Sequence, residues 1–166
     1  MTLARLLAIW FGTGLLRPAP GTWGSAVAVA LGLLLHRAGH FPLLLAATVA
    51  IVPLGFWATA KAVEHQDDKD PSEIVIDEVA GQWIALLVPS AGFWWAGLPA
   101  TNFPWPGWVA AFLFFRLFDI WKPWLVGRAD AKHTAFGTME DDLWAGLFAG
   151  LATFIAAGLW HGVMAL

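Results

Sequence analysis

The stretch AGHFPLLLAATVAIVPLGFWATA (residues 38–60) decides the class of fold. It runs for 23 residues without a charged side chain, and a helix needs about 20 mostly apolar residues to cross a bilayer. Three further uncharged stretches flank it, at residues 18–36, 79–115 and 143–166. The sequence therefore predicts an all-α, polytopic helical membrane protein.

The composition agrees with this prediction and excludes several classes of function. Charged residues make up 13% of the 166 residues, against about 25% in a typical soluble domain, and the mean hydropathy is +0.67. The length predicts a single domain covering residues 1–166. A net charge of −3 without a basic stripe argues against a nucleic-acid partner. The absence of cysteine excludes disulfides and thiol chemistry.

We expect about four or five apolar helices. Four of them cover residues 38–60, 77–97, 107–121 and 143–163. The fifth, 22–36, is short and is weakened by Gly24 and Gly32, so it either spans the bilayer or re-enters it. The segment 98–107, which contains three prolines, forms a turn between two helices, and residues 3–11 lie at the membrane interface.

The charged residues are concentrated in two windows, 61–78 and 116–142, which hold 18 of the 21. When the expected helices are threaded through a membrane, both windows fall on one side. Eight of the nine Lys and Arg residues then lie on that side, and only Arg37 lies on the other. Because cytoplasmic loops carry an excess of Lys and Arg, we expect one polar site that faces the cytoplasm.

The first polar motif is GTGLLRPAPGTWGS (12–25). Its glycines and prolines indicate a tight loop, and Thr22 and Ser25 are expected to cap the helix that follows. Free N–H groups at a helix N-terminus bind phosphate well. A plain turn with an N-cap explains the same residues, and the Gly-Lys-Ser/Thr of a P-loop is missing.

Two further motifs place carboxylates next to expected helices. Asp77 and Glu78 open DEVAG (77–81), where they either cap a helix or bind a cation. The run EDDLWAG (140–146) places three acids directly before the last span. Crowded carboxylates are costly unless a cation neutralises them, and oxygen ligands without cysteine favour Mg²⁺.

The remaining motif, FRLFDIWKPW (115–124), carries charges at the end of an apolar helix. Arg116, Asp119 and Lys122 are spaced by three and fall along one helix face. An ion pair within the helix is the simpler interpretation, although charges in such segments usually mark function. Together the four motifs predict metal-assisted phosphoryl chemistry on a lipid head group.

The four motifs, in this order across residues 12–146, resemble the phosphatidylglycerophosphatase A family. The matching stretches are 12–25, 77–81, 115–124 and 141–146. The resemblance implies a bacterial inner-membrane, Mg²⁺-dependent phosphatase that converts phosphatidylglycerophosphate to phosphatidylglycerol and phosphate. Leu125 stands where the family pattern has a proline, which affects the loop after Lys122 more than the chemistry.

We assign roles to the polar residues on this basis. The expected catalytic residues are Arg116, Asp119, Lys122 and Asp142. The expected substrate-binding residues are Arg17, Thr22, Gly24 and Ser25. The expected metal ligands are Asp77, Glu78 and Asp141. Direct attack by water and an aspartyl-phosphate intermediate both fit these residues.

Two other classes of protein share some of these features. A small channel or transporter also places ionisable residues inside a helical bundle, but it predicts charges near mid-membrane. A soluble all-α enzyme with an unusually apolar core would leave the membrane on carbonate extraction without detergent.

Overall fold

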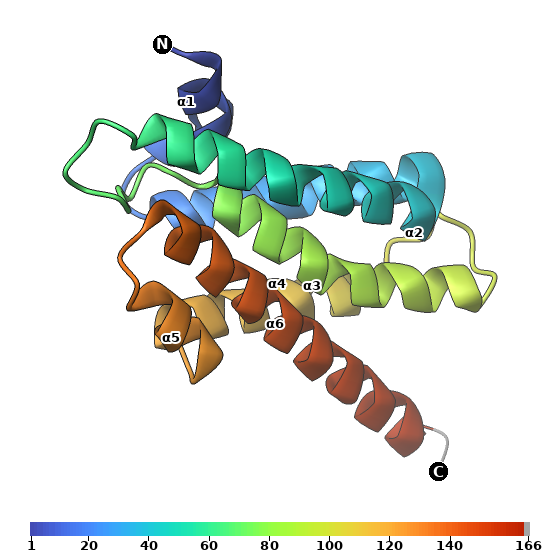
Figure 1. The fold of residues 1–166 in the computed structure, drawn as a ribbon. Helices are drawn as coiled ribbons and strands as arrows, with labels where there is room; N and C mark the ends of the chain where they lie inside the picture. The colour runs from blue at the N-terminus through green and yellow to red at the C-terminus, as the bar shows by residue number, and fades with distance from the viewer. Residues whose placement is uncertain (165–166) are drawn as a thin grey trace.

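The computed structural model describes residues 1–164 and is helical throughout, with no strand in that range. The elements are, in order, α1 (Leu3–Ala8), the 3₁₀ helix η1 (Trp10–Leu15), α2 (Pro20–Ala62), α3 (Ile76–Trp95), α4 (Trp105–Trp121), α5 (Leu125–Asp130) and α6 (Ala135–Met164) (Figure 1). The all-α prediction is confirmed.

The longest element, α2, is a helical hairpin (Figure 1). Its helical geometry is broken at Gly39 and at His40, whose φ is 58°, and the chain reverses direction there. The expected short helix 22–36 is therefore the first arm of α2. The arm begins at Pro20, which needs no N–H partner in a first helical turn.

Two expectations about helix starts are wrong. Thr22 and Ser25 lie inside α2, which has no side-chain cap at its start, so they do not cap the helix. The last helix begins at Ala135 rather than at 143. The hydroxyl of Thr134 accepts a hydrogen bond of 3.0 Å from the Gly137 N–H, as an N-cap residue does, so the acids of 140–142 lie within the helix.

The other two expected helices agree closely with α3 and α4, and the proline-rich segment between them forms a turn. Leu125, at the position of the expected proline, is the first residue of α5. Proline also fits a first helical position, so this departure from the family pattern stays local.

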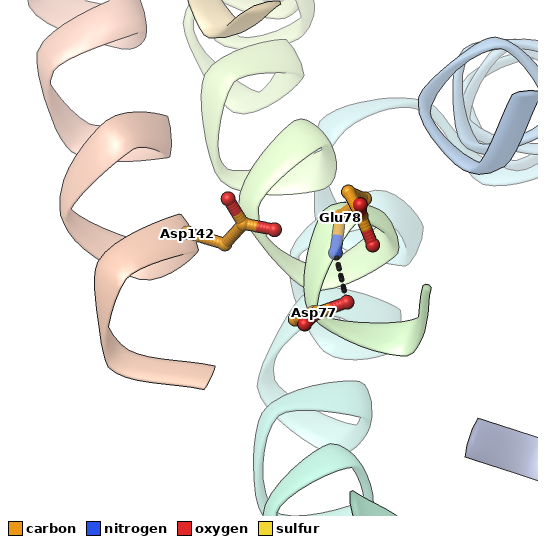
Figure 2. Close-up of side chains that lie close together, drawn as sticks. All are labelled: Asp77, Glu78 and Asp142. Atoms are coloured by element: carbon orange, nitrogen blue, oxygen red, sulfur yellow. Dashed lines mark hydrogen bonds between the residues drawn. The ribbon is translucent and has the colours of Figure 1, made fainter. Parts of the chain in front are cut away.

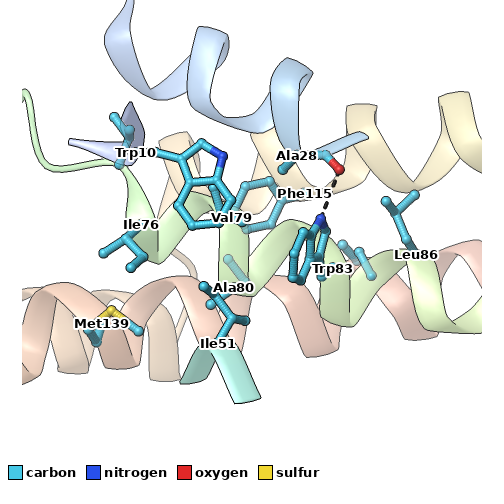
Figure 3. Close-up of a cluster of buried hydrophobic side chains, with 14 of the residues drawn as sticks. Trp10, Ala28, Ile51, Ile76, Val79, Ala80, Trp83, Leu86, Phe115 and Met139 are labelled. Carbon is cyan, nitrogen blue, oxygen red and sulfur yellow. Dashed lines mark hydrogen bonds between the residues drawn. The ribbon is translucent and has the colours of Figure 1, made fainter. Parts of the chain in front are cut away.

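The apolar core lies where the helices cross (Figure 3). Trp83 on α3 is 6% exposed, and its indole N–H donates a 2.8 Å hydrogen bond to the Ala28 carbonyl on the first arm of α2. Phe115 from α4 and Met139 from α6 are fully buried in the same cluster. This packing fixes the start of α3 against its neighbours.

The outer surface carries many large apolar side chains. Leu34, Val49 and Phe154 are 61%, 65% and 67% exposed, although a soluble protein rarely exposes large contiguous apolar patches. Two helical segments, Pro20–Ala62 and Ala135–Trp160, are long and apolar enough to cross a membrane. The arrangement suits a chain whose solvent is lipid.

The two ends of the molecule differ in polarity. The connection between α2 and α3, the start of α6 and all of α5 lie at one end (Figure 1). The turn at Gly39–His40 and the connection between α3 and α4 lie at the other (Figure 1). The two charged windows therefore meet at the first end.

Candidate active site

A polar cavity of about 210 Å³ opens at this charged end. Four segments contribute to it: the connection before α3, the first turn of α3, the end of α4 and the start of α6. The lining residues are Asp70, Ser72, Ile74, Asp77, Glu78, Asp119, Lys122, Thr138, Asp141 and Asp142. Six of the predicted site residues thus share one cavity.

Three carboxylates form a close group, with Asp142 of α6 pointing toward Asp77 and Glu78 of α3 (Figure 2). One oxygen from each lies within 4.8 Å of the other two. Asp77 and Asp142 are 4% and 3% exposed. The Glu78 N–H donates a 2.9 Å hydrogen bond to Asp77 Oδ1, which fixes one carboxylate at the helix start.

Two oxygens of this group, Glu78 Oε2 and Asp142 Oδ1, are buried and have no hydrogen-bond partner among the described residues. A buried carboxylate without a partner is strongly destabilising. A divalent cation bound between the three side chains would remove this penalty. Because the donors are all oxygens, the group fits Mg²⁺.

Two glycines bring the carboxylates together by allowing close contact of α3 and α6. A Cβ on Gly146 would lie 2.3 Å from the Gly81 carbonyl oxygen. A Cβ on Gly81 would lie 2.4 Å from the carbonyl oxygen of Asp142. Only glycine fits at such distances, so the glycine of each motif determines where the acids of the other lie.

Lys122 provides positive charge at the cavity wall. It ends α4 in the left-handed region, with φ of 50°, and its Nζ donates hydrogen bonds to Asp130 and to Asp141 Oδ2, the latter at 2.8 Å. Burial alone lowers the pKa of an ammonium group, but the two carboxylates raise the pKa of Lys122 above its ordinary value. The group therefore stays charged.

Arg116 pairs with Asp119 but does not itself line the cavity. Its Nη1 is 2.6 Å from Asp119 Oδ2 and donates a 3.3 Å hydrogen bond to Ser25 Oγ. A Cβ on Gly21 would lie 2.2 Å from Glu78 Oε1 and 3.3 Å from Arg116 Nη1. The start of α2 therefore packs directly on the charged side chains of α3 and α4.

The predicted substrate-binding residues are placed differently. Arg17, Thr22, Gly24 and Ser25 do not line the cavity within the described part of the chain. Gly24 packs on Val75, because a Cβ there would lie 2.9 Å from the Val75 Cβ. Arg17 donates a 3.5 Å hydrogen bond to the Ser72 hydroxyl, and Ser25 reaches Arg116.

Four residues of the charged end lay outside the sequence prediction: Asp70, Ser72, Asp130 and Thr138. The first two belong to the polar connection, which is held in place by the ion pair between Arg5 and Glu73 and by Lys69, whose Nζ caps the Val63 carbonyl at 2.9 Å. Burial raises the pKa of Asp70, and the charge of Lys122 opposes that rise.

Sequence signals for two of these residues exist. Ser72 lies so close in sequence to Asp77 that it stays near the same helix start. Thr138 is four residues before Asp142 and shares a helix face with it, but only when the helix is known to begin at Ala135.

Comparisons with known proteins agree with the sequence motifs. A protein of Haemophilus influenzae named phosphatidylglycerophosphatase A is 36% identical over 150 residues, covering 90% of this chain and 85% of that protein. One of Escherichia coli with the same name is 33% identical over 154 residues, covering 90% and 81%. A Bacteroides thetaiotaomicron protein, named provisionally as a phosphatidylinositol-3-phosphatase, is 36% identical over 156 residues, covering 91% of each.

No solved structure matched the chain. The family model described as phosphatidylglycerophosphatase A matches residues 6–157, which include all four motifs and every residue of the cavity. The chain therefore belongs to the phosphatidylglycerophosphatase A family of phosphoric monoester hydrolases.

Proposed function

We propose that this protein hydrolyses the terminal phosphomonoester of phosphatidylglycerophosphate in a Mg²⁺-dependent reaction, releasing phosphatidylglycerol and phosphate. The observation that carries the proposal is the group of Asp77, Glu78 and Asp142, which has two buried unpartnered oxygens and lies with Lys122 in one cavity. The family and the names of the relatives support the choice of substrate.

The carboxylates have two kinds of role in this proposal. Asp77, Glu78 and Asp142 would hold the cation, so Asp142 joins the proposed metal ligands instead of the catalytic residues. Asp141 contributes from the preceding position on α6, where Lys122 orients it at 2.8 Å. Bound Mg²⁺ supplies Lewis-acid stabilisation of phosphate oxygens and a water with a lowered pKa. Asp119, which lines the cavity, accepts a proton from the attacking water or attacks the phosphorus itself.

The basic residues neutralise phosphate charge. An ammonium group has three N–H donors, and Lys122 uses two of them on Asp130 and Asp141, which leaves one for a phosphate oxygen. Arg116 holds Asp119 in place and adds positive charge beside Ser25. Such preorganised charges stabilise a transferring phosphoryl group more than they stabilise the bound substrate.

The same proposal places the protein in a bacterial inner membrane with the cavity facing the cytoplasm. The two arms of α2, together with α3, α4 and α6, cross the bilayer. The exposed apolar side chains of these helices support this arrangement, as does the position of Arg37 at the far end, beside the turn of α2. The lipid then presents its head group at the charged end.

The decisive experiment is a phosphate-release assay on detergent-purified protein. We expect rapid hydrolysis of phosphatidylglycerophosphate with Mg²⁺ and none with EDTA. Asp142→Asn removes a carboxylate of the buried group and should lower kcat by about 100-fold or more, the scale found when one electrostatic contact is removed. Glu140→Gln is the matched control, because Glu140 pairs with Lys132 and does not line the cavity.

Two outcomes would contradict the proposal. One is full activity of Asp142→Asn in a variant whose melting temperature matches wild type. The other is activity that does not respond to EDTA. Phosphatidylinositol 3-phosphate belongs in the substrate panel because of the Bacteroides relative, and faster hydrolysis of that lipid would replace the proposed substrate while keeping the site.

A further inference from the structure

We propose that an apolar groove between the first arm of α2 and α4 binds one acyl chain of the lipid substrate; this inference rests on the proposed function. The groove has a volume of about 220 Å³. It is lined by Ala26, Val29, Phe103, Trp108, Val109 and Phe112. Its lining contains no charged side chain.

The groove has a rigid floor and an open side. Trp108 is 1% exposed, and its indole N–H donates a 3.3 Å hydrogen bond to the Val29 carbonyl, which fixes the ring against α2. Phe103 and Val109 are 46% and 47% exposed and form the open edge. An apolar ligand can therefore enter from the side, where the lipid lies.

The groove continues from the charged residues on both helices. Ala26 directly follows Ser25, the residue that accepts a hydrogen bond from Arg116. On α4, Phe112 lies one turn before Arg116, so the backbones of these two residues are about 6 Å apart along the helix axis. Asp119, at the cavity, lies a further 4.5 Å or so in the opposite direction.

This order of polarity matches the order of groups in the proposed substrate. A phosphomonoester in the cavity is followed by a glycerol, a phosphodiester and the acyl chains. Along α4 the side chains change from charged, at Asp119 and Arg116, to apolar, at Phe112 and Val109. A lipid with its terminal phosphate in the cavity therefore directs a chain along the groove, away from the charged end.

The test compares chain lengths in a variant that fills the groove. Ala26→Phe places a ring in the groove, and we expect its kcat/KM for dipalmitoyl phosphatidylglycerophosphate to fall about tenfold or more, since single methylene groups in apolar pockets change discrimination by about 10–200-fold. Hydrolysis of the dihexanoyl lipid in the same mixed micelles should change less than about threefold. Ala50→Phe, an exposed position on the other arm of α2, is the matched control.

A second variant tests the groove without adding bulk. Phe112→Ala removes one wall and should raise KM for the dipalmitoyl lipid while leaving the dihexanoyl lipid unchanged. Equal losses on both lipids in both variants, or equal behaviour of Ala26→Phe and Ala50→Phe, would overturn the inference. If wild-type protein hydrolyses neither lipid, it is the proposed function that fails.

Discussion

At the scale of single residues, Lys122 connects several parts of the site. It ends α4, binds carboxylates from α5 and α6, and lines the cavity. Asp141, its partner, is 5% exposed, and removal of one member of a buried pair leaves the other charge without compensation. Lys122 therefore contributes to both the stability and the chemistry of the site.

Replacement of Lys122 should separate these two contributions. We expect Lys122→Met to lower kcat about 100-fold or more and also to lower the melting temperature, whereas Lys122→Arg keeps the charge and should retain part of both. Lys132→Met is the control, because Lys132 pairs with Glu140 outside the cavity. Steady-state kinetics and thermal unfolding in detergent measure the two effects. Similar losses in the two methionine variants would show that Lys122 has no special role.

The residues of the site were only partly predictable. Carboxylates at the ends of long apolar segments stand out in a sequence because their burial is costly without a compensating positive charge. Asp77, Asp119 and Asp142 were predicted in this way. Asp70 and Ser72 were missed because a polar connection is normally solvated, and only the ion pair of Arg5 with Glu73, a long-range contact, shows where this one is held.

At the scale of elements, the contact between α3 and α6 determines the geometry of the site. Gly81 and Gly146 let the two backbones meet, one turn after the carboxylates that each helix supplies. The long uncharged apolar stretches indicated both helices, but they carry no information on which faces meet. In both motifs a glycine follows the acid by about one helical turn, and the structure shows why: the glycines allow the close contact that brings the acids together.

A methyl group at the contact should move the helices apart. Gly146→Ala places a Cβ 2.3 Å from the Gly81 carbonyl oxygen, and backbone cannot yield as a side chain does. We expect about a tenfold or greater loss of kcat, since displacements near 1 Å can cost about 100-fold, together with a lower melting temperature. Gly158→Ala, where no atom lies within 4 Å, should behave as wild type. An active, stable Gly146→Ala variant would contradict the close contact.

Helix boundaries were less predictable than helix identity. The expected start of the last helix was wrong because a polar stretch was expected to precede it, whereas Thr134 caps a helix that already contains the buried Asp141 and Asp142. The expected caps Thr22 and Ser25 were wrong for the opposite reason: Pro20 starts α2 without any side-chain cap. Local composition does not distinguish these cases, because tertiary contacts decide them.

At the scale of the whole molecule, the proposed membrane arrangement makes a prediction that the composition helps to test. The chain has no cysteine, so a single introduced thiol reports one position. We expect His65→Cys and Ala131→Cys to react with an impermeant thiol reagent only after cells are permeabilised, and Thr101→Cys to react in intact cells. All three positions are exposed. Labelling of all three from the same side would contradict the arrangement.

Because the cavity lies at one end of the bundle, the proposed reaction acts on one leaflet only. Substrate and product need not cross the bilayer, since the lipid enters and leaves beside the same ends of α2 and α4. Each turnover removes a phosphomonoester, which carries about 1.5 to 2 negative charges at neutral pH. The enzyme therefore lowers the surface charge density of the leaflet from which it draws its substrate, and weakens the attraction of that leaflet for polybasic proteins.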